Sequence, residues 1–266
     1  MSKENKLIQK FFLVTAPVLA ISALGISPTR AATFASSSSR LDFQNFSQAP
    51  STINNFSDAN TGVFEKGGVI EATAIANAVF SESLISAEPE INLSEVFGEN
   101  QAYLGFAESL SQNIGNFDIE AGTSFSFDFQ ADLELETSID NPSSENATAS
   151  GDISFLLVNT DDNSIFDFFD IAGNLTTEGD SDFIGLRESD NVKLNQPSIN
   201  SDFDGLEESL QVSVSGSFKR TFANPTNLAL IEFQRNRVLA KAPEPSTSLA
   251  LLLSTGVIGI IIKRRR

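Results

Sequence analysis

The side chains best suited to chemistry are oxygen ligands in an acidic segment late in the chain. Asn200, Asp202 and Asp204 occupy alternate positions before a glycine, and Glu208 follows. This spacing is typical of the first half of a calcium-binding loop, in which Glu208 would stand at the ninth position. The twelfth position, which should supply a bidentate Glu, is Gln211. The segment therefore predicts either a turn, for which Asp, Asn and Gly are suited, or a weak calcium loop.

Catalysis is restricted to carboxylates. The sequence has no histidine and no cysteine, which removes the commonest general base, thiol nucleophiles and the usual zinc ligands. It also lacks a nucleophile elbow, a P-loop and a dinucleotide fingerprint. Two carboxylates can hydrolyse a glycan, but 35 acidic residues supply such pairs by chance, and Tyr103 is the only Tyr or Trp. We expect a protein that is not an enzyme. A carbohydrate-binding module or a glycan hydrolase is the alternative.

The negative charge lies between the two ends of the chain. The formal net charge is −18, residues 1–31 sum to +3 and the last four residues to +4, so the segment between them carries −25. A surface of this charge repels nucleic acid and anionic lipid. We therefore expect no nucleic-acid partner. Without cysteine the domain takes no stability from disulfides and depends on its core.

Period-two alternation predicts the strands that must position these side chains. The clearest strand runs from Thr123 to Thr137, with Phe, Ala and Leu on one face and polar residues on the other. Further alternating segments begin at Ile153, Phe166 and Leu210, and a final strand is predicted from Leu228 to Phe233. Short strands punctuated by turns are typical of a β-sandwich. The sequence predicts an all-β fold, a single jelly-roll-like or Ig-like sandwich over residues 63–240.

Two earlier segments are less regular. Residues 33–62 are rich in Ser, Asn and Gln and are predicted to be a loose lead-in with one short strand from Leu41 to Phe46. Val69 to Phe80 alternates with period two but is rich in Ala, so an amphipathic helix fits nearly as well. We prefer a strand there.

The N-terminus has the layout of a secretory signal peptide. Three lysines lie within the first ten residues, an apolar stretch runs from Phe11 to Leu24, and small residues around Ala31 offer a cleavage site. We therefore predict a signal helix over residues 1–32. An uncleaved signal anchor is the alternative.

The C-terminal segment 241–266 has three parts. They are Pro243-Glu244-Pro245, an uncharged run from Ser246 to Ile262, and the basic end Lys263-Arg264-Arg265-Arg266. The run is at the short end of what crosses a bilayer as a helix, and the basic end should stay on the cytoplasmic side. In their order and their position, these parts resemble the PEP-CTERM sorting signal of Gram-negative bacteria and cyanobacteria.

The resemblance implies a destination and a partner. In that family a membrane exosortase recognises the tripeptide, removes the tail and passes the protein to the cell exterior. We therefore expect an exported protein that the C-terminal helix holds in the membrane before processing. It would then lie at the cell surface or outside the cell, where exopolysaccharide is a candidate partner. A permanently tail-anchored surface protein is the alternative.

One basic island lies near the end of the predicted domain. Arg235 and Arg237 precede Lys241 in an otherwise acidic region. We predict that these cations mark a solvated sheet edge that discourages pairing with other strands. A contact with the exosortase is the alternative.

Overall fold

The computed structural model describes residues 32–80, 91–100, 102–142, 144–177, 179 and 181–242. The predicted signal peptide up to residue 31 lies outside the described residues. So do the motif Pro243-Glu244-Pro245, the apolar run and the basic end from Lys263 to Arg266. In the part that is described, no helix is long and apolar enough to cross a bilayer.

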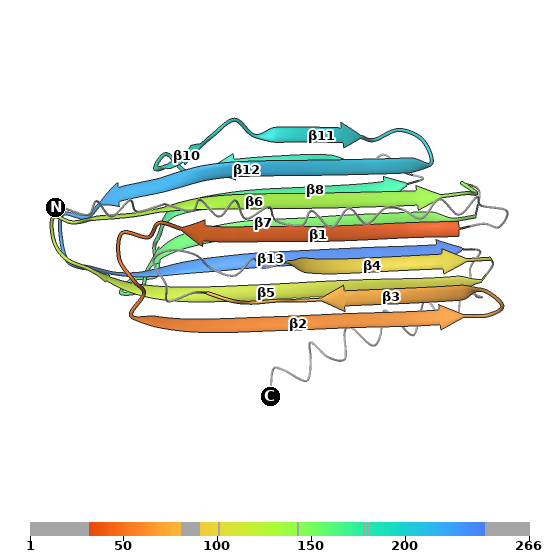
Figure 1. Ribbon diagram of the computed structural model, residues 1–266, viewed down its shortest axis with the longest axis horizontal. Coiled ribbons are helices and arrows are strands. Elements are labelled where there is room, and N and C mark those ends of the chain that lie inside the picture. The colour runs from red at the N-terminus through yellow and green to blue at the C-terminus, as the bar shows by residue number, and fades with distance from the viewer. Residues whose placement is uncertain are drawn as a thin grey trace, which may run out of the picture.

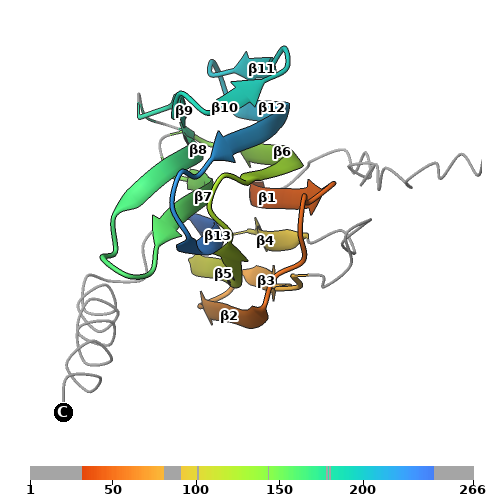
Figure 2. The same cartoon turned by 90° about the vertical axis from the view of Figure 1, so that its left-hand side faces the viewer.

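The described chain is all-β, with thirteen strands in two antiparallel sheets packed face to face (Figures 1 and 2). Sheet A has the order β10 (Val192–Leu194), β12 (Glu207–Thr221), β6 (Ser124–Ile139), β1 (Ala32–Gln44), β4 (Asn92–Glu99) and β3 (Val69–Ile75), with β11 (Ser198–Asp202) also paired to β12. Sheet B has the order β2 (Thr52–Glu65), β5 (Tyr103–Ile119), β13 (Thr226–Ala242), β7 (Asn146–Asn159), β8 (Ile165–Thr177) and β9 (Phe183–Glu188). The two-layered all-β prediction is confirmed.

A cluster of phenylalanines fills the apolar part of the space between the sheets. The inward residues of β6 include Phe125, Phe127 and Phe129, each at most 1% exposed. The Phe127 ring lies 5.4 Å from that of Phe155 in sheet B and 5.3 Å from that of Phe43 in β1, centroid to centroid. Burying one such side chain stabilises the fold by about 1.5–3 kcal/mol. The strict alternation of β6 thus supplies the main apolar face of sheet A.

The loose lead-in predicted for residues 33–62 is wrong. The segment forms most of β1 and β2, and β1 is an interior strand of sheet A between β6 and β4. Its inward positions include Ser37 and Ser39, both at most 2% exposed. The short strand predicted from Leu41 to Phe46 coincides with the end of β1, where Leu41 and Phe43 are inward. Before Leu41, polar serines hold inward positions, so hydrophobic periodicity did not reveal the rest of the strand.

Two other boundaries differ from the prediction. The strand expected over Val69 to Phe80 ends at Ile75, and Phe80 is buried in the core beyond it. The last strand continues past Phe233 to Ala242. The edge predicted at Arg235 and Arg237 is also wrong, because β13 lies between β5 and β7 in the interior of sheet B.

An ion pair joins the two sheets near one end of the sandwich. Asp167 of β8 is 1% exposed and accepts from Arg220 Nη1 of β12 at 2.9 Å. Its other carboxylate oxygen accepts from Ser189 Oγ at 2.9 Å and from Asn191 Nδ2 at 3.0 Å. The guanidinium also lies 4.4 Å from the ring centroid of Phe166. The buried charge is therefore paired and hydrogen-bonded.

Replacement of this arginine should destabilise the fold strongly. Arg220→Ala leaves the Asp167 charge buried without its cation, and we expect a loss of about 3 kcal/mol in the free energy of unfolding, measured with urea. Arg187→Ala is the matched control, because Arg187 pairs with Asp170 but is 73% exposed. Its loss should stay below about 1 kcal/mol. Equal losses for the two variants would contradict this role.

Candidate functional site

A shallow depression of about 330 Å³ lies on the outer face of sheet A. It forms where β11 pairs with β12, which in turn pairs with β6. Alternation along each strand brings two cross-strand rows to this face, one of Asn200, Gln211 and Glu134 and one of Asp202, Ser209 and Glu136. Carboxylates, amides and a hydroxyl are therefore presented side by side.

The depression has a negative electrostatic character. Partial burial raises the pKa of Glu136, and the charges of Glu134 and Glu95 raise it further. Burial also raises the pKa of Glu95. Such a surface can accept hydrogen bonds from hydroxyl or ammonium groups, and it disfavours an anionic ligand.

The structure brings together two of the four predicted calcium ligands. Asn200 and Asp202 line the depression, and Asp204 lies in the following turn, where its N–H donates to Asp202 Oδ1 at 3.3 Å. Glu208 is 5% exposed and belongs to the opposite, inward face of β12. Its Oε2 accepts from Thr177 Oγ1 at 2.9 Å, and burial raises its pKa. Alternation therefore separates Glu208 from the others.

A metal centre has no further support from the geometry. Among the described residues, no group of three or more acidic side chains is arranged to hold a metal ion.

A second polar cluster is enclosed between the sheets, and we call it the interior polar layer. Sheet B contributes Glu232, Gln234 and Asn236 from consecutive inward positions of β13, each at most 1% exposed. The other members come from β1, β4 and β5 and are likewise buried, namely Ser37, Ser39, Asn92, Ser94, Ser109, Ser111 and Asn113. A buried polar group without a partner costs about 1–3 kcal/mol, so these residues must satisfy one another.

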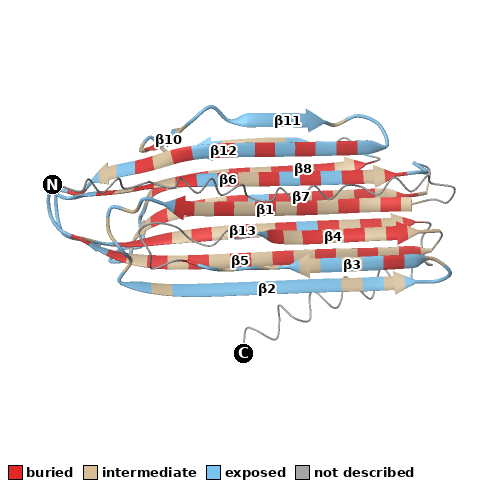
Figure 3. Cartoon of the chain, viewed as in Figure 1, coloured by how far each residue is buried: buried red, intermediate tan, exposed pale blue. Residues whose placement is uncertain are grey.

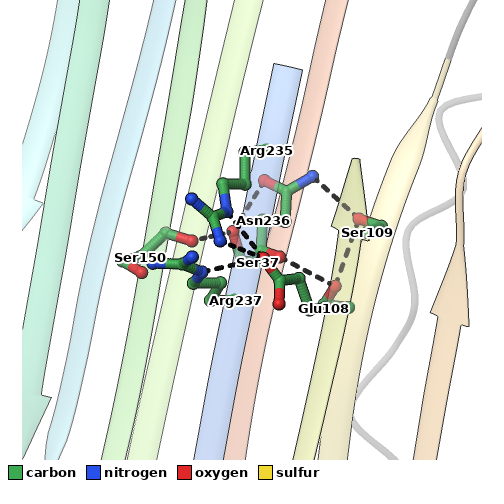
Figure 4. Close-up of polar contacts among 8 residues, drawn as sticks. Ser37, Glu108, Ser109, Ser150, Arg235, Asn236 and Arg237 are labelled. Atoms are coloured by element: carbon green, nitrogen blue, oxygen red, sulfur yellow. Dashed lines mark hydrogen bonds and ion pairs between the residues drawn. The ribbon is translucent and has the colours of Figure 1, made fainter. Parts of the chain in front are cut away.

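Asn236 lies at the centre of this layer. Its Nδ2 donates to Ser39 Oγ at 2.8 Å and to the Asn92 carbonyl at 3.1 Å. Its Oδ1 accepts from Ser37 Oγ at 2.8 Å (Figure 4). Ser37 Oγ is also 2.9 Å from the Ser150 carbonyl oxygen. One amide thus bridges the two sheets through side-chain and main-chain partners.

The opposite face of β13 carries the basic island. Arg235 Nε and Arg237 Nε both donate to Glu108 Oε1 on β5, at 2.6 and 2.9 Å (Figure 4). Lys241 follows on the same face of the strand. The island is therefore an ion-pair cluster on the outer face of sheet B.

Glu232 is the one strongly perturbed carboxyl of the interior polar layer. It is 1% exposed, with Oε2 accepting from Asn113 Nδ2 at 3.0 Å and Oε1 from Gln234 Nε2 at 2.7 Å. Burial raises its pKa to about 7, against the lowering effect of these two hydrogen bonds. The carboxyl is thus enclosed among its partners in the interior of the sandwich.

This carboxyl should make the protein more stable in mild acid. The folded state binds a proton between pH 4.5 and about 7 that the unfolded chain does not bind. The resulting stabilisation is complete below the unfolded pKa and is lost as the pH rises through 7, by about 3 kcal/mol. Desolvated Glu95, Glu136, Asp152 and Glu208 act in the same direction.

Urea unfolding between pH 4 and 8 checks this dependence. Glu232→Gln removes the titrating group and keeps one of the two acceptor oxygens, so the variant should lose less stability than the wild type between pH 4 and 8. Glu188→Gln, at an exposed position, should keep the wild-type dependence. A Glu232→Gln profile parallel to that of the wild type would contradict the assignment.

Comparison with known proteins identifies no relative. No family model, no curated protein and no solved structure matches the chain.

Sequence reasoning missed most residues of both polar clusters. The sequence predicts Glu134 and Glu136 on the solvent-facing side of a strand, as observed, but their proximity to Asn200 depends on pairing across β12. The alternation of Leu228 and Leu230 continues through Glu232 to Asn236. This continuation of the two-residue period was the signal that could have identified Glu232, Gln234 and Asn236 as inward-facing residues.

Proposed function

We propose that the protein is an exported, non-enzymatic component of the cell surface or extracellular matrix, sorted by an exosortase through its PEP-CTERM tail. The observation that carries the proposal is the position of the sorting motif. β13 ends at Ala242, and Pro243 is the next residue. Removal of everything from the motif onward would leave β13 and the remainder of both sheets intact.

The composition and surface charge of the domain suit an extracellular protein. It has no cysteine that could be oxidised, and its strongly acidic surface favours solubility. The predicted signal peptide would export it, and the tail would hold it until processing. The polar groups at the centre of the sandwich are enclosed and bonded to one another, which favours a structural role over catalysis.

Within the β-sandwich class we propose a jelly-roll-like arrangement. The chain passes repeatedly from one sheet to the other, as in β1 to β2, β4 to β5, β5 to β6 and β6 to β7. Repeated crossing of this kind is typical of double-sheet jelly rolls.

Substitutions in the sorting motif test the proposal. Alanine at Pro243, Glu244 and Pro245 together should abolish release and leave the protein in the membrane fraction, because the exosortase would have no tripeptide to recognise. Ser246→Ala with Thr247→Ala is the control and should be released like the wild type. Immunoblots of medium and membrane fractions report the distribution. Unchanged release of the triple variant would refute sorting, and a wild type that stays in the membrane would indicate a permanent tail anchor.

A second candidate, carbohydrate binding, is favoured by the lining of the depression on sheet A. Amide and carboxylate groups of Asn200, Gln211 and Glu134 lie in one cross-strand row and can bond sugar hydroxyls. The negative surface favours neutral or amino sugars over acidic ones.

Affinity electrophoresis through gels containing neutral polysaccharides tests this candidate. Asn200→Ala with Gln211→Ala should abolish any retardation, since both changes remove amides from the depression. Ser217→Ala lies on the same face of β12 outside the depression and should not alter migration. Equal retardation of all three proteins would place the binding elsewhere.

A further inference from the structure

Among the described residues, β2 forms a long edge of sheet B. Within the described chain it pairs with β5 alone, in one unbroken register from Thr52 to Glu65. Residues 54–61 are all exposed, and the strand is pale along most of its length in Figure 3. The other edge of this sheet, β9, is only 6 residues long against 14 for β2.

The register shows which backbone groups of β2 face outward. The Lys66 N–H donates to the Ala102 carbonyl at 2.7 Å, next to the pair Glu65 and Tyr103. Hydrogen-bonded and non-bonded pairs alternate along an antiparallel ladder. The even-numbered residues of β2 therefore bond to β5, and the seven odd-numbered residues from Ile53 to Glu65 direct their N–H and C=O groups away from the sheet.

The side chains of this edge do little to block another strand. Natural edges are commonly protected by Pro, Lys or a bulge. Between Thr52 and Glu65 there is no Pro, Lys or Arg, and Asp58 is the only charge before the terminal Glu65. The edge can serve as a template for a further strand.

We propose that this strand is β2 of a second copy of the chain, paired antiparallel about a two-fold axis at Ala59. The backbone groups that face outward belong to the odd-numbered residues of β2. In a symmetric ladder, the hydrogen bonds must therefore join odd-numbered residues of one copy to odd-numbered residues of the other. With Ala59 at the axis, Ser57 faces Thr61 of the partner subunit and Ile53 faces Glu65 of the partner subunit. This register uses the whole strand and forms about fourteen main-chain hydrogen bonds.

The outer-face side chains favour the same register. Asp58 then lies opposite Asn60 of the partner subunit, and Phe56 lies in the ladder opposite Gly62 of the partner subunit, a residue with no side chain of its own. Gly62 already has the Phe106 ring above it, since a Cβ built at Gly62 would lie 2.2 Å from Phe106 Cε1. A register centred on Asp58 would oppose two like charges, which is destabilising. One centred on Ser57 or Asn60 would leave more of the strand unpaired.

Cysteine cross-linking of the full chain tests the axis, because the protein has no cysteine of its own. Cα atoms of a hydrogen-bonded antiparallel pair lie about 5.5 Å apart, within reach of a disulfide. In mild detergent and oxidant, Ala59→Cys should form a covalent dimer. Ser57→Cys or Thr61→Cys alone should not, but the two variants mixed together should. Equal cross-linking of Ser57→Cys alone, or none for Ala59→Cys, would overturn the proposal.

A proline variant tests the hydrogen bonds independently. Ala59→Pro removes an N–H that faces away from β5, which an edge strand tolerates. Sedimentation of the full chain in detergent should show a dimer for the wild type and loss of the dimer for Ala59→Pro, with an unchanged circular dichroism spectrum. A monomeric wild type, or a dimer that survives in a folded Ala59→Pro variant, would overturn the interface.

Discussion

The fold depends on mutual satisfaction of the polar groups enclosed between its two sheets. Glu232, Gln234 and Asn236 enter the interior from β13, and each needs partners that only particular neighbours supply. Ser37 and Ser39 of the opposite sheet meet this need only when the sheets are aligned as observed. Apolar burial drives the sheets together, while an unpaired interior amide or carboxylate costs about 1–3 kcal/mol in any other alignment. The polar layer therefore selects one packing among many.

β13 connects this interior to the rest of the molecule. Its inward face carries the polar layer, its outward face carries the Arg235 and Arg237 pairs with Glu108, and its last residue precedes the predicted sorting motif. Because β5 and β7 flank the strand on both sides, the end of the domain is anchored in the middle of a sheet. The sorting proposal requires such an anchor, because it has the domain held by its C-terminus and then released.

Strands could be recognised from the sequence where the buried positions are apolar and the exposed positions are polar. The strand at Phe125 to Leu135 and the strand at Leu210 to Phe218 were recognisable because their inward positions are apolar. Only the end of β1, from Leu41, was recognisable, because the inward Ser37 and Ser39 before it are polar. β2 was not recognisable, because residues 54–61 are all exposed and their side chains show no alternation. The depression at Asn200 could not be predicted at all, since it depends on three strands whose pairing no local pattern encodes.

Intact-mass measurement of the protein from culture medium, set beside that from the membrane fraction, tests the sorting account most directly. The account predicts a released species that lacks the signal segment and everything after the region of Pro243, Glu244 and Pro245. A protein found only in membranes, with Arg264, Arg265 and Arg266 still present, would contradict release and indicate a tail-anchored surface protein.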